Sequence, residues 1–221
     1  MTELDVQRHP LIVRIAHWVL ALSILVMIGS GWRIYNSSPI FPFSFPAAIT
    51  LGGDVSKALS RHNDPGVASA IAWHFAGIWL LFASFALFLA HGVISGDFRR
   101  DFLPVGPRAF TRDFIAAARF KLEHRLGHYN AVQKVFYWGA LFAVAMMILS
   151  GLAIWKPVQL HPLELLFGGF QGARIVHFLF MTAITLFLLV HVALVILVPQ
   201  TFIAMTLGRA SHPAPRKERS A

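Results

Sequence analysis

The stretch IVHFLFMTAITLFLLVHVALVILV, residues Ile175–Val198, decides the fold. Its 24 residues include no Asp, Glu, Lys or Arg, and a helix needs roughly 20 apolar residues to cross a bilayer. The run is continuously apolar rather than alternating, which favours a membrane helix over a strand of a membrane barrel. Three further charge-free stretches predict three more membrane helices: Ile15–Trp32, Val67–Gly96 and Val135–Trp155.

The composition agrees with a membrane protein. Of the 221 residues, 57% are hydrophobic and 13% are charged, whereas a soluble domain is about one quarter charged. The net charge of +9 is also typical of proteins that bind nucleic acid. Here the charges lie in the gaps between apolar runs, so they indicate membrane topology and no nucleic-acid partner is expected. The absence of cysteine excludes disulfides, thiolate-held iron–sulfur clusters and thiol-attached haem.

The Lys and Arg residues predict the orientation in the membrane. Fourteen of them fall in the N-terminal segment, the gap between the second and third spans, and the tail, against five in the other two gaps. The positive-inside rule therefore places both termini and the middle gap in the cytoplasm. The first span is too long for a signal peptide, so we expect it to be retained. The prediction is an all-α, integral membrane four-helix bundle, with one domain over residues 1–209 and a disordered cytoplasmic tail over residues 210–221.

Two connecting segments have recognisable patterns. The inner segment Thr111–Leu126 has apolar residues at the spacing of an amphipathic helix lying on a lipid surface. A solvated connector helix is an equally good interpretation. The outer segment Asn36–Asp64 contains three phenylalanines and three prolines, and we expect it to cap the outer face or to contact a partner.

Five histidines fall inside the predicted spans, where ionisable groups are costly and usually functional. His177 and His191 are 14 residues apart on one helix, roughly 21 Å along its axis and within roughly 40° of the same face. That helix therefore presents one imidazole near each membrane surface. Matching the depths pairs His17 with His191 near the inner surface, and His74 with His177 near the outer surface. The fifth, His91, lies on a different face of its helix from His74.

Two imidazoles on facing helices suit the two axial positions of a haem iron. Zinc or copper would instead require three or four clustered ligands. The alternative for each histidine is an ordinary hydrogen bond between helices. Four glycines in the spans either make room for a flat macrocycle or reflect small-residue helix packing: Gly29, Gly31, Gly77 and Gly151.

Six stretches, in order along the chain, resemble those of a known family: RIAHW (Arg14–Trp18), AWHF (Ala72–Phe75), SGDFRRDFLP (Ser95–Pro104), YNAVQK (Tyr129–Lys134), FGGFQGARIVHF (Phe167–Phe178) and HVALVIL (His191–Leu197). In these the sequence resembles the bacterial cytochrome b561/Ni-hydrogenase family, from about His9 to Arg209. It looks most like the cytochrome b subunits of thiosulfate reductase and formate dehydrogenase type. The resemblance implies two haem b groups, with the axial ligands His17, His74, His177 and His191.

The resemblance also implies a function. Members transfer electrons between the quinone pool and a redox partner, often a periplasmic subunit with molybdenum or another metal, across the bacterial inner membrane. The chain itself is then a respiratory electron-transfer subunit with no catalytic residue of its own. One alternative is a stand-alone quinone-linked oxidoreductase, such as a superoxide:quinone enzyme. Another is a transporter or structural bundle without haem.

A polar cluster near the inner surface is the expected quinone or propionate contact. It centres on His91, Arg99 and Lys134, at the facing ends of the second and third spans. Histidine exchanges protons near neutral pH, which suits a proton donor to quinone. His91 could also compete with His17 as a ligand. The alternative for the whole cluster is that its residues are interface anchors and topology charges without a role in quinone binding. Its other members are Asp97, Arg100, Tyr129, Asn130 and Gln133.

Overall fold

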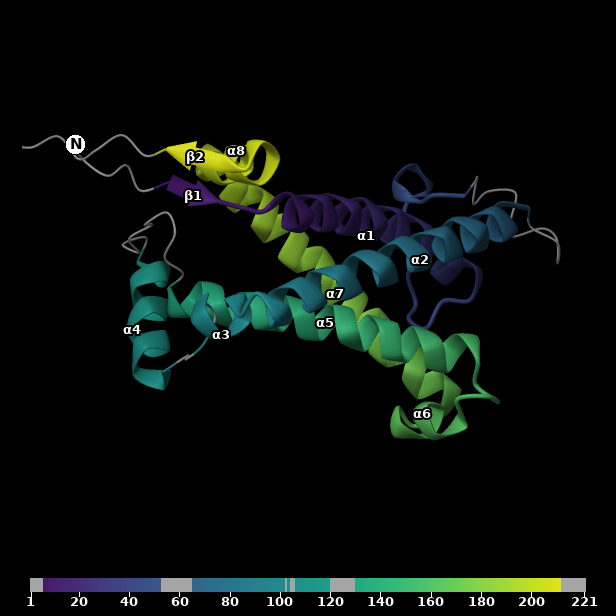
Figure 1. The fold of residues 1–221 in the computed structure, drawn as a ribbon. Helices are drawn as coiled ribbons and strands as arrows, with labels where there is room; N and C mark the ends of the chain where they lie inside the picture. Colours follow the sequence, from purple (N-terminus) through teal and green to yellow (C-terminus); the bar gives the residue numbers. More distant parts are fainter. Residues whose placement is uncertain (1–5, 53–64, 102, 104–105, 120–129, 212–221) are drawn as a thin grey trace, which may run out of the picture. The chain divides into compact units, whose positions relative to one another are not determined.

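The computed structural model describes residues 6–52, 65–101, 103, 106–119 and 130–211 (Figure 1). Four long helices make up most of this chain: α1 (Leu11–Ser37), α2 (Pro65–Ile94), α5 (Ala131–Trp155) and α7 (Gly169–Leu197). The shorter elements are β1 (Val6–Arg8), η1 (Ala47–Ile49), α3 (Asp97–Asp101), α4 (Pro107–Ala118), α6 (His161–Leu166), α8 (Pro199–Leu207) and β2 (Arg209–Ser211).

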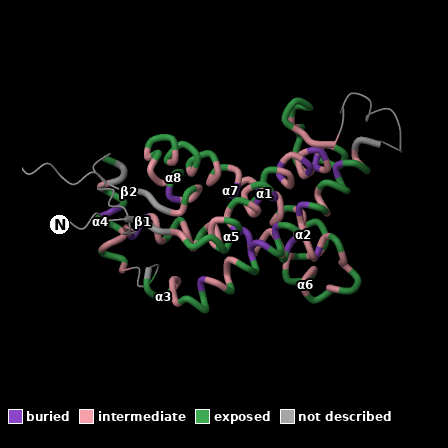
Figure 2. Tube along the Cα trace, turned by 45° about the horizontal axis from the view of Figure 1, so that its top comes forward, coloured by how far each residue is buried: buried purple, intermediate pink, exposed green. Residues whose placement is uncertain are grey.

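The four long helices are the predicted membrane spans. Each is long and apolar enough to cross a membrane, which confirms the all-α, four-span prediction. Between 11% and 28% of the most apolar window of each helix is buried, so most apolar side chains face outward. Figure 2 shows exposed and half-buried positions along all four. Apolar side chains on the outside suit contact with lipid, because hydrocarbon chains are as apolar as these side chains and their exposure to lipid costs no free energy of hydration.

Each long helix begins before its charge-free stretch and α1 also ends after it, whereas α2 ends at Ile94, before Gly96. α1 continues through Arg33 to Ser37, and α7 begins at Gly169 rather than at Ile175. A charged side chain limits the part of a helix that lies in hydrocarbon, but it does not interrupt the backbone hydrogen bonds. The charge-free criterion therefore finds the membrane part of each helix and misses its polar ends.

The chain forms two compact units, and each long helix contributes to both. The central unit comprises Ala16–Leu89 and Ala140–Leu188, and the terminal unit comprises Met1–Ile15, Ala90–Gly139 and Leu189–Ala221. The core of the central unit is apolar and draws on three of the helices. Its buried members are Leu81, Phe85, Ala143, Val144 and Ile184.

In the terminal unit the two ends of the described chain pair with each other. β1 and β2 are antiparallel, with Val6 opposite Ser211, a pairing that the sequence did not predict. Beside it, α8 ends at Gly208, which adopts a left-handed φ of 84°. The Arg14 guanidinium donates to the Thr206 carbonyl, so a cation caps the C-terminal end of α8, where the helix dipole is negative.

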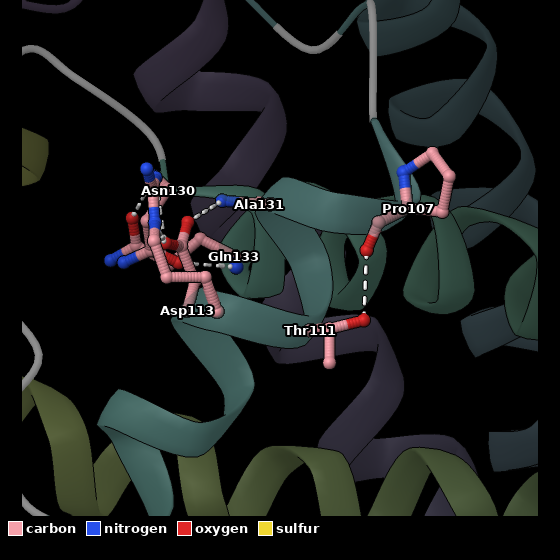
Figure 3. A network of polar contacts seen from close by, with 7 residues as sticks. Pro107, Thr111, Asp113, Asn130, Ala131 and Gln133 are labelled. Atoms are coloured by element: carbon pink, nitrogen blue, oxygen red, sulfur yellow. Dashed lines mark hydrogen bonds and ion pairs between the residues drawn. The ribbon is translucent and has the colours of Figure 1, made fainter.

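Also in the terminal unit, α4 caps the start of α5 (Figure 3). The Asp113 carboxylate accepts a hydrogen bond from the Ala131 backbone N–H at 2.9 Å. Asn130 and Gln133 form a reciprocal capping box, with N···O distances of 2.9 and 3.1 Å. The predicted amphipathic segment is thus helical over its described part, and Phe114 on it is exposed. Residues 120–126 of the predicted segment lie outside the described residues.

Candidate haem-binding site

The central unit brings His74 of α2 together with His177 of α7. Their ring centroids lie 6.4 Å apart with an interplanar angle of 62°. They were predicted to share the outer depth of the bundle, and the structure places the two rings next to each other, edge to face, between α2 and α7. Their role as haem ligands is not tested by this and stays a prediction.

The separation fits a single metal ion between the two rings. A metal–imidazole bond is roughly 2 Å long and the nitrogen lies about 1 Å from its ring centre, so opposite ligands of one iron have centroids about 6 Å apart. Among the described residues no group of three or more His, Cys, Asp or Glu side chains could hold a metal ion. A haem, whose ring supplies four nitrogens itself, is the metal group that two imidazoles alone can hold.

A buried serine contacts each of these histidines. The Ser30 hydroxyl on α1 lies 3.0 Å from His74 Nδ1, and the Ser150 hydroxyl on α5 lies 2.9 Å from His177 Nδ1. Both serines are fully buried. Each of the four long helices therefore contributes one side chain to this site, a histidine or the serine that contacts it.

A glycine follows each serine and lies against the same imidazole. A Cβ added at Gly31 would lie 3.5 Å from His74 Cε1, and one added at Gly151 would lie 3.3 Å from His177 Cε1. The other two glycines lie against other side chains, since Gly29 faces Leu51 and Gly77 faces Met27, as small-residue packing predicts. Room for a macrocycle beside Gly31 and Gly151 stays a prediction.

The loop after α1 folds over the helices near His177. Phe41 and Phe43 have ring centroids 5.3 and 6.1 Å from that of Phe178, and Trp32 stacks on Phe45 at 4.7 Å. The described part of this loop therefore covers α1 and α7 with aromatic rings, as expected for a cap.

One buried cation accompanies the outer pair. Arg33 has no exposed surface and lies one helical turn beyond Ser30 on the same face of α1. The charge-free criterion placed it outside the first span, and nothing in the sequence pattern predicted its burial.

The predicted inner pair is divided between the two units. His17 belongs to the central unit and lies edge-on to Trp18 at 5.5 Å. His191 belongs to the terminal unit, and both side chains are half-buried. Their pairing remains a prediction from helical geometry.

The polar cluster around His91 lies in the terminal unit. His91 Nδ1 is 3.7 Å from a carboxylate oxygen of Asp97, whose other oxygen accepts from Arg100 at 2.6 Å. Arg99 is exposed and Lys134 is half-buried. Asn130 and Gln133 are occupied in capping α5, which favours the anchoring interpretation for these two, and Tyr129 lies outside the described residues.

Sequence reasoning missed the two serines. Ser-Gly occurs in the first span at Ser30–Gly31 and in the third at Ser150–Gly151, but also at Ser95–Gly96 at the end of the second predicted span, so this dipeptide alone does not single out the two serines. Only the glycines drew notice, since an isolated serine in a membrane helix usually bonds to its own helix.

Comparison with known proteins identifies the family. The chain matches the family model described as prokaryotic cytochrome b561 over residues 8–208. It is also 42% identical over 201 residues to a protein of Azospira oryzae named putative protein-methionine-sulfoxide reductase subunit YedZ1, covering 90% of this chain and 96% of that protein. The match includes all four membrane helices, and the expected family is confirmed. The chain belongs to the prokaryotic cytochrome b561 family and is a multi-pass membrane cytochrome b, a haem b-binding electron-transfer subunit.

Proposed function

We propose that the chain passes electrons across the bacterial inner membrane through two haem b groups, one held by His74 and His177 and one by His17 and His191. The observation that carries the proposal is the 6.4 Å between the ring centroids of His74 and His177, which suits a six-coordinate iron. A bound haem supplies reversible one-electron chemistry. The chain's own residues hold it at a fixed depth and exclude water from it.

Arg33 suits the haem of the outer pair. Arg33 is fully buried on α1, and haem has two propionate carboxylates of the opposite charge. A guanidinium can hold a carboxylate through two parallel hydrogen bonds. We assign Arg33, one turn from Ser30 in the same unit, to a propionate.

Quinone is the proposed electron donor or acceptor on the cytoplasmic side. His91, Asp97 and Arg100 form a chain of polar contacts at the end of α2, close in sequence to Arg99. Quinone chemistry couples electrons to protons, and a histidine beside a carboxylate is a suitable proton carrier. Arg99 and Lys134 supply nearby positive charge.

The redox partner is proposed to be a periplasmic catalytic subunit with a metal cofactor. The Azospira relative is named as a subunit of a putative protein-methionine-sulfoxide reductase, and this favours a reductase of that class over a stand-alone enzyme. A tagged chain should then co-purify with a reductase subunit, and methionine sulfoxide should reoxidise the reduced haems only in its presence. Reduction of the isolated chain's haems by superoxide, followed by their reoxidation by quinone, would favour the stand-alone alternative.

The haem site is tested by removing its ligands. We expect His74→Ala and His177→Ala each to leave about half of the bound haem, because each removes one axial ligand of the outer centre alone. The measurement is the haem-to-protein ratio with the reduced-minus-oxidised spectrum. His161→Ala is the matched control, since His161 is exposed on α6 and bonds to Glu164. Full retention of two haems in either ligand variant would refute the assignment.

A further inference from the structure

We propose that Ser30 and Ser150 are positioning residues that lock His74 and His177 in the tautomer with a free Nε2, and thereby lower the redox potential of the haem between them. This inference rests on the proposed outer haem. It assigns a role to two serines that no part of the proposed function uses. The argument depends on where the single hydroxyl proton of each serine goes.

The Ser30 hydroxyl has three polar neighbours. Its oxygen lies 2.7 Å from the Val26 carbonyl, 3.3 Å from the Met27 carbonyl and 3.0 Å from His74 Nδ1. A carbonyl can only accept a hydrogen bond, and the shortest distance is to Val26. The hydroxyl proton is therefore donated to the helix, and the contact with His74 requires the ring to donate its Nδ1–H to Oγ.

The Ser150 hydroxyl repeats this geometry on a different pair of helices. Its oxygen lies 2.6 Å from the Met146 carbonyl, 3.3 Å from the Met147 carbonyl and 2.9 Å from His177 Nδ1. The same reasoning places the proton on His177 Nδ1. Two separate helix pairs thus reach one arrangement, in which each ring has its Nε2 lone pair left for iron.

Burial strengthens the hydrogen bonds that hold the proton on Nδ1 of each histidine. Both serines have no exposed surface, so no bulk water competes for the Nδ1 protons. A hydrogen bond is stronger in such surroundings, and a donor left without a partner is costly. The glycine after each serine lies beside the ring: an added Cβ at Gly151 would press on His177 Cε1 at 3.3 Å, whereas one at Gly31 would be in ordinary contact with His74 Cε1 at 3.5 Å.

The expected consequence is electronic as well as geometric. A hydrogen bond from the distal N–H of a ligating histidine fixes its tautomer and ring orientation and raises its basicity. A more basic ligand stabilises the ferric over the ferrous ion, and hydrogen bonding around the ligands is one of the means by which a protein sets a haem potential. Loss of either hydroxyl should therefore raise the potential of this haem and leave the other unchanged.

The chain offers a matched control for the experiment. Ser84 on α2 is also buried, and its hydroxyl lies 2.7 and 3.2 Å from the Leu80 and Leu81 carbonyls. It makes the same two bonds to its own helix and, within the described part of the chain, no hydrogen bond to a histidine. Ser84→Ala thus measures the effect of losing a buried serine alone.

We would prepare Ser30→Ala, Ser150→Ala and Ser84→Ala holoprotein and titrate each potentiometrically, with electron paramagnetic resonance of the ferric haems. Two haems, a higher midpoint potential for one centre and a shifted low-spin signal are expected for Ser30→Ala and Ser150→Ala, and wild-type values for Ser84→Ala. Unchanged potentials in both histidine-contacting variants, or an equal shift in Ser84→Ala, would overturn the proposal.

If an alanine variant loses one haem, the threonine variant at the same position, which keeps the hydroxyl, shows whether the hydroxyl is the cause. Recovery of that haem and its potential in Ser150→Thr or Ser30→Thr supports the positioning role, and failure to recover in both contradicts it. These results are distinct from failure of the haem site itself, which would appear as retention of both haems in His74→Ala or His177→Ala.

Discussion

Gly31 and Gly151 lie against equivalent histidine atoms but leave them different amounts of room. At Gly31 an added methyl would be in ordinary contact at 3.5 Å, whereas at Gly151 it would press on His177 at 3.3 Å. Alanine in a helix gains about 0.5–1 kcal/mol over glycine, while overpacking costs about 1–3 kcal/mol. The sign of the net effect should therefore differ between the two positions.

We expect Gly31→Ala to retain the thermal stability and haem spectrum of the wild type or to improve the stability slightly. Gly151→Ala should lower the unfolding temperature and broaden or shift the haem absorption bands, because the ring of His177 must move. Thermal scans of both holoproteins with absorption detection provide the measurement. Equal behaviour of the two variants would mean that the helices adjust freely and the glycines are not matched to the rings.

His91 is the residue on which the quinone proposal depends. We expect His91→Ala to keep both haems and to slow quinol-driven haem reduction severalfold, because the contact with Asp97 is lost. His161→Ala is again the control, since it removes a histidine–carboxylate contact at 2.9 Å elsewhere. Loss of a haem would make His91 a ligand, and an unchanged reduction rate would make it an interfacial anchor.

At the scale of elements, the junction of α4 with α5 depends on Asp113. Its carboxylate accepts from the first backbone N–H of α5 and lies 3.0 Å from the Arg112 guanidinium. The Ala131 N–H, with a further contribution from Arg112 and against the opposing effect of burial, holds the pKa of this carboxyl below its usual 3.8. A carboxyl whose pKa is lowered on folding stabilises the fold above its usual pKa, and this stabilisation is lost as the pH falls through the folded value.

Asp113→Asn should therefore lower the stability at neutral pH by less than the roughly 1 kcal/mol of a lost helix cap, because the amide oxygen can still accept from the Ala131 N–H and only the charge is removed. The difference from wild type should shrink as the pH falls below 3.8, because the wild-type carboxyl is then protonated as well. Unfolding temperatures in detergent between neutral and acid pH would reveal this convergence. A difference that stays constant with pH would exclude the carboxylate charge as its cause.

For the whole molecule, the testable property is the orientation in the membrane. Reporter fusions after Gly106 and after Ala221 should report the cytoplasm, and a fusion near Gly53 should report the outside, because the Lys and Arg excess lies with the former two. The pairing of β1 with β2 places the two ends of the described chain on one side, in agreement. An external Gly106 fusion would reverse the orientation, and the haem of His74 and His177 and the partner subunit would then be assigned to opposite sides of the membrane from those proposed.

The four spans were predictable because transfer into hydrocarbon depends on local composition, and a run of apolar residues is sufficient to specify a membrane helix. The ends were less predictable. The stretch Tyr129–Lys134 matches a family pattern and suggests polar groups near a quinone, yet Asn130 and Gln133 cap α5. The β1–β2 pair was missed because three-residue strands carry too few residues for a recognisable alternation.

The sequence by itself determined the number of membrane helices, the position of each histidine along its helix and the haem family, since all three follow from spacing along single helices and from motifs. Only the tertiary structure decided that His74 faces His177, that Ser30 and Ser150 contact them, and that Gly31 and Gly151 rather than Gly29 and Gly77 lie against the rings. These contacts join residues 26 to 103 positions apart, and they depend on how neighbouring helices are rotated about their axes. Side-chain packing between helices fixes that rotation, and no periodicity within one helix encodes it.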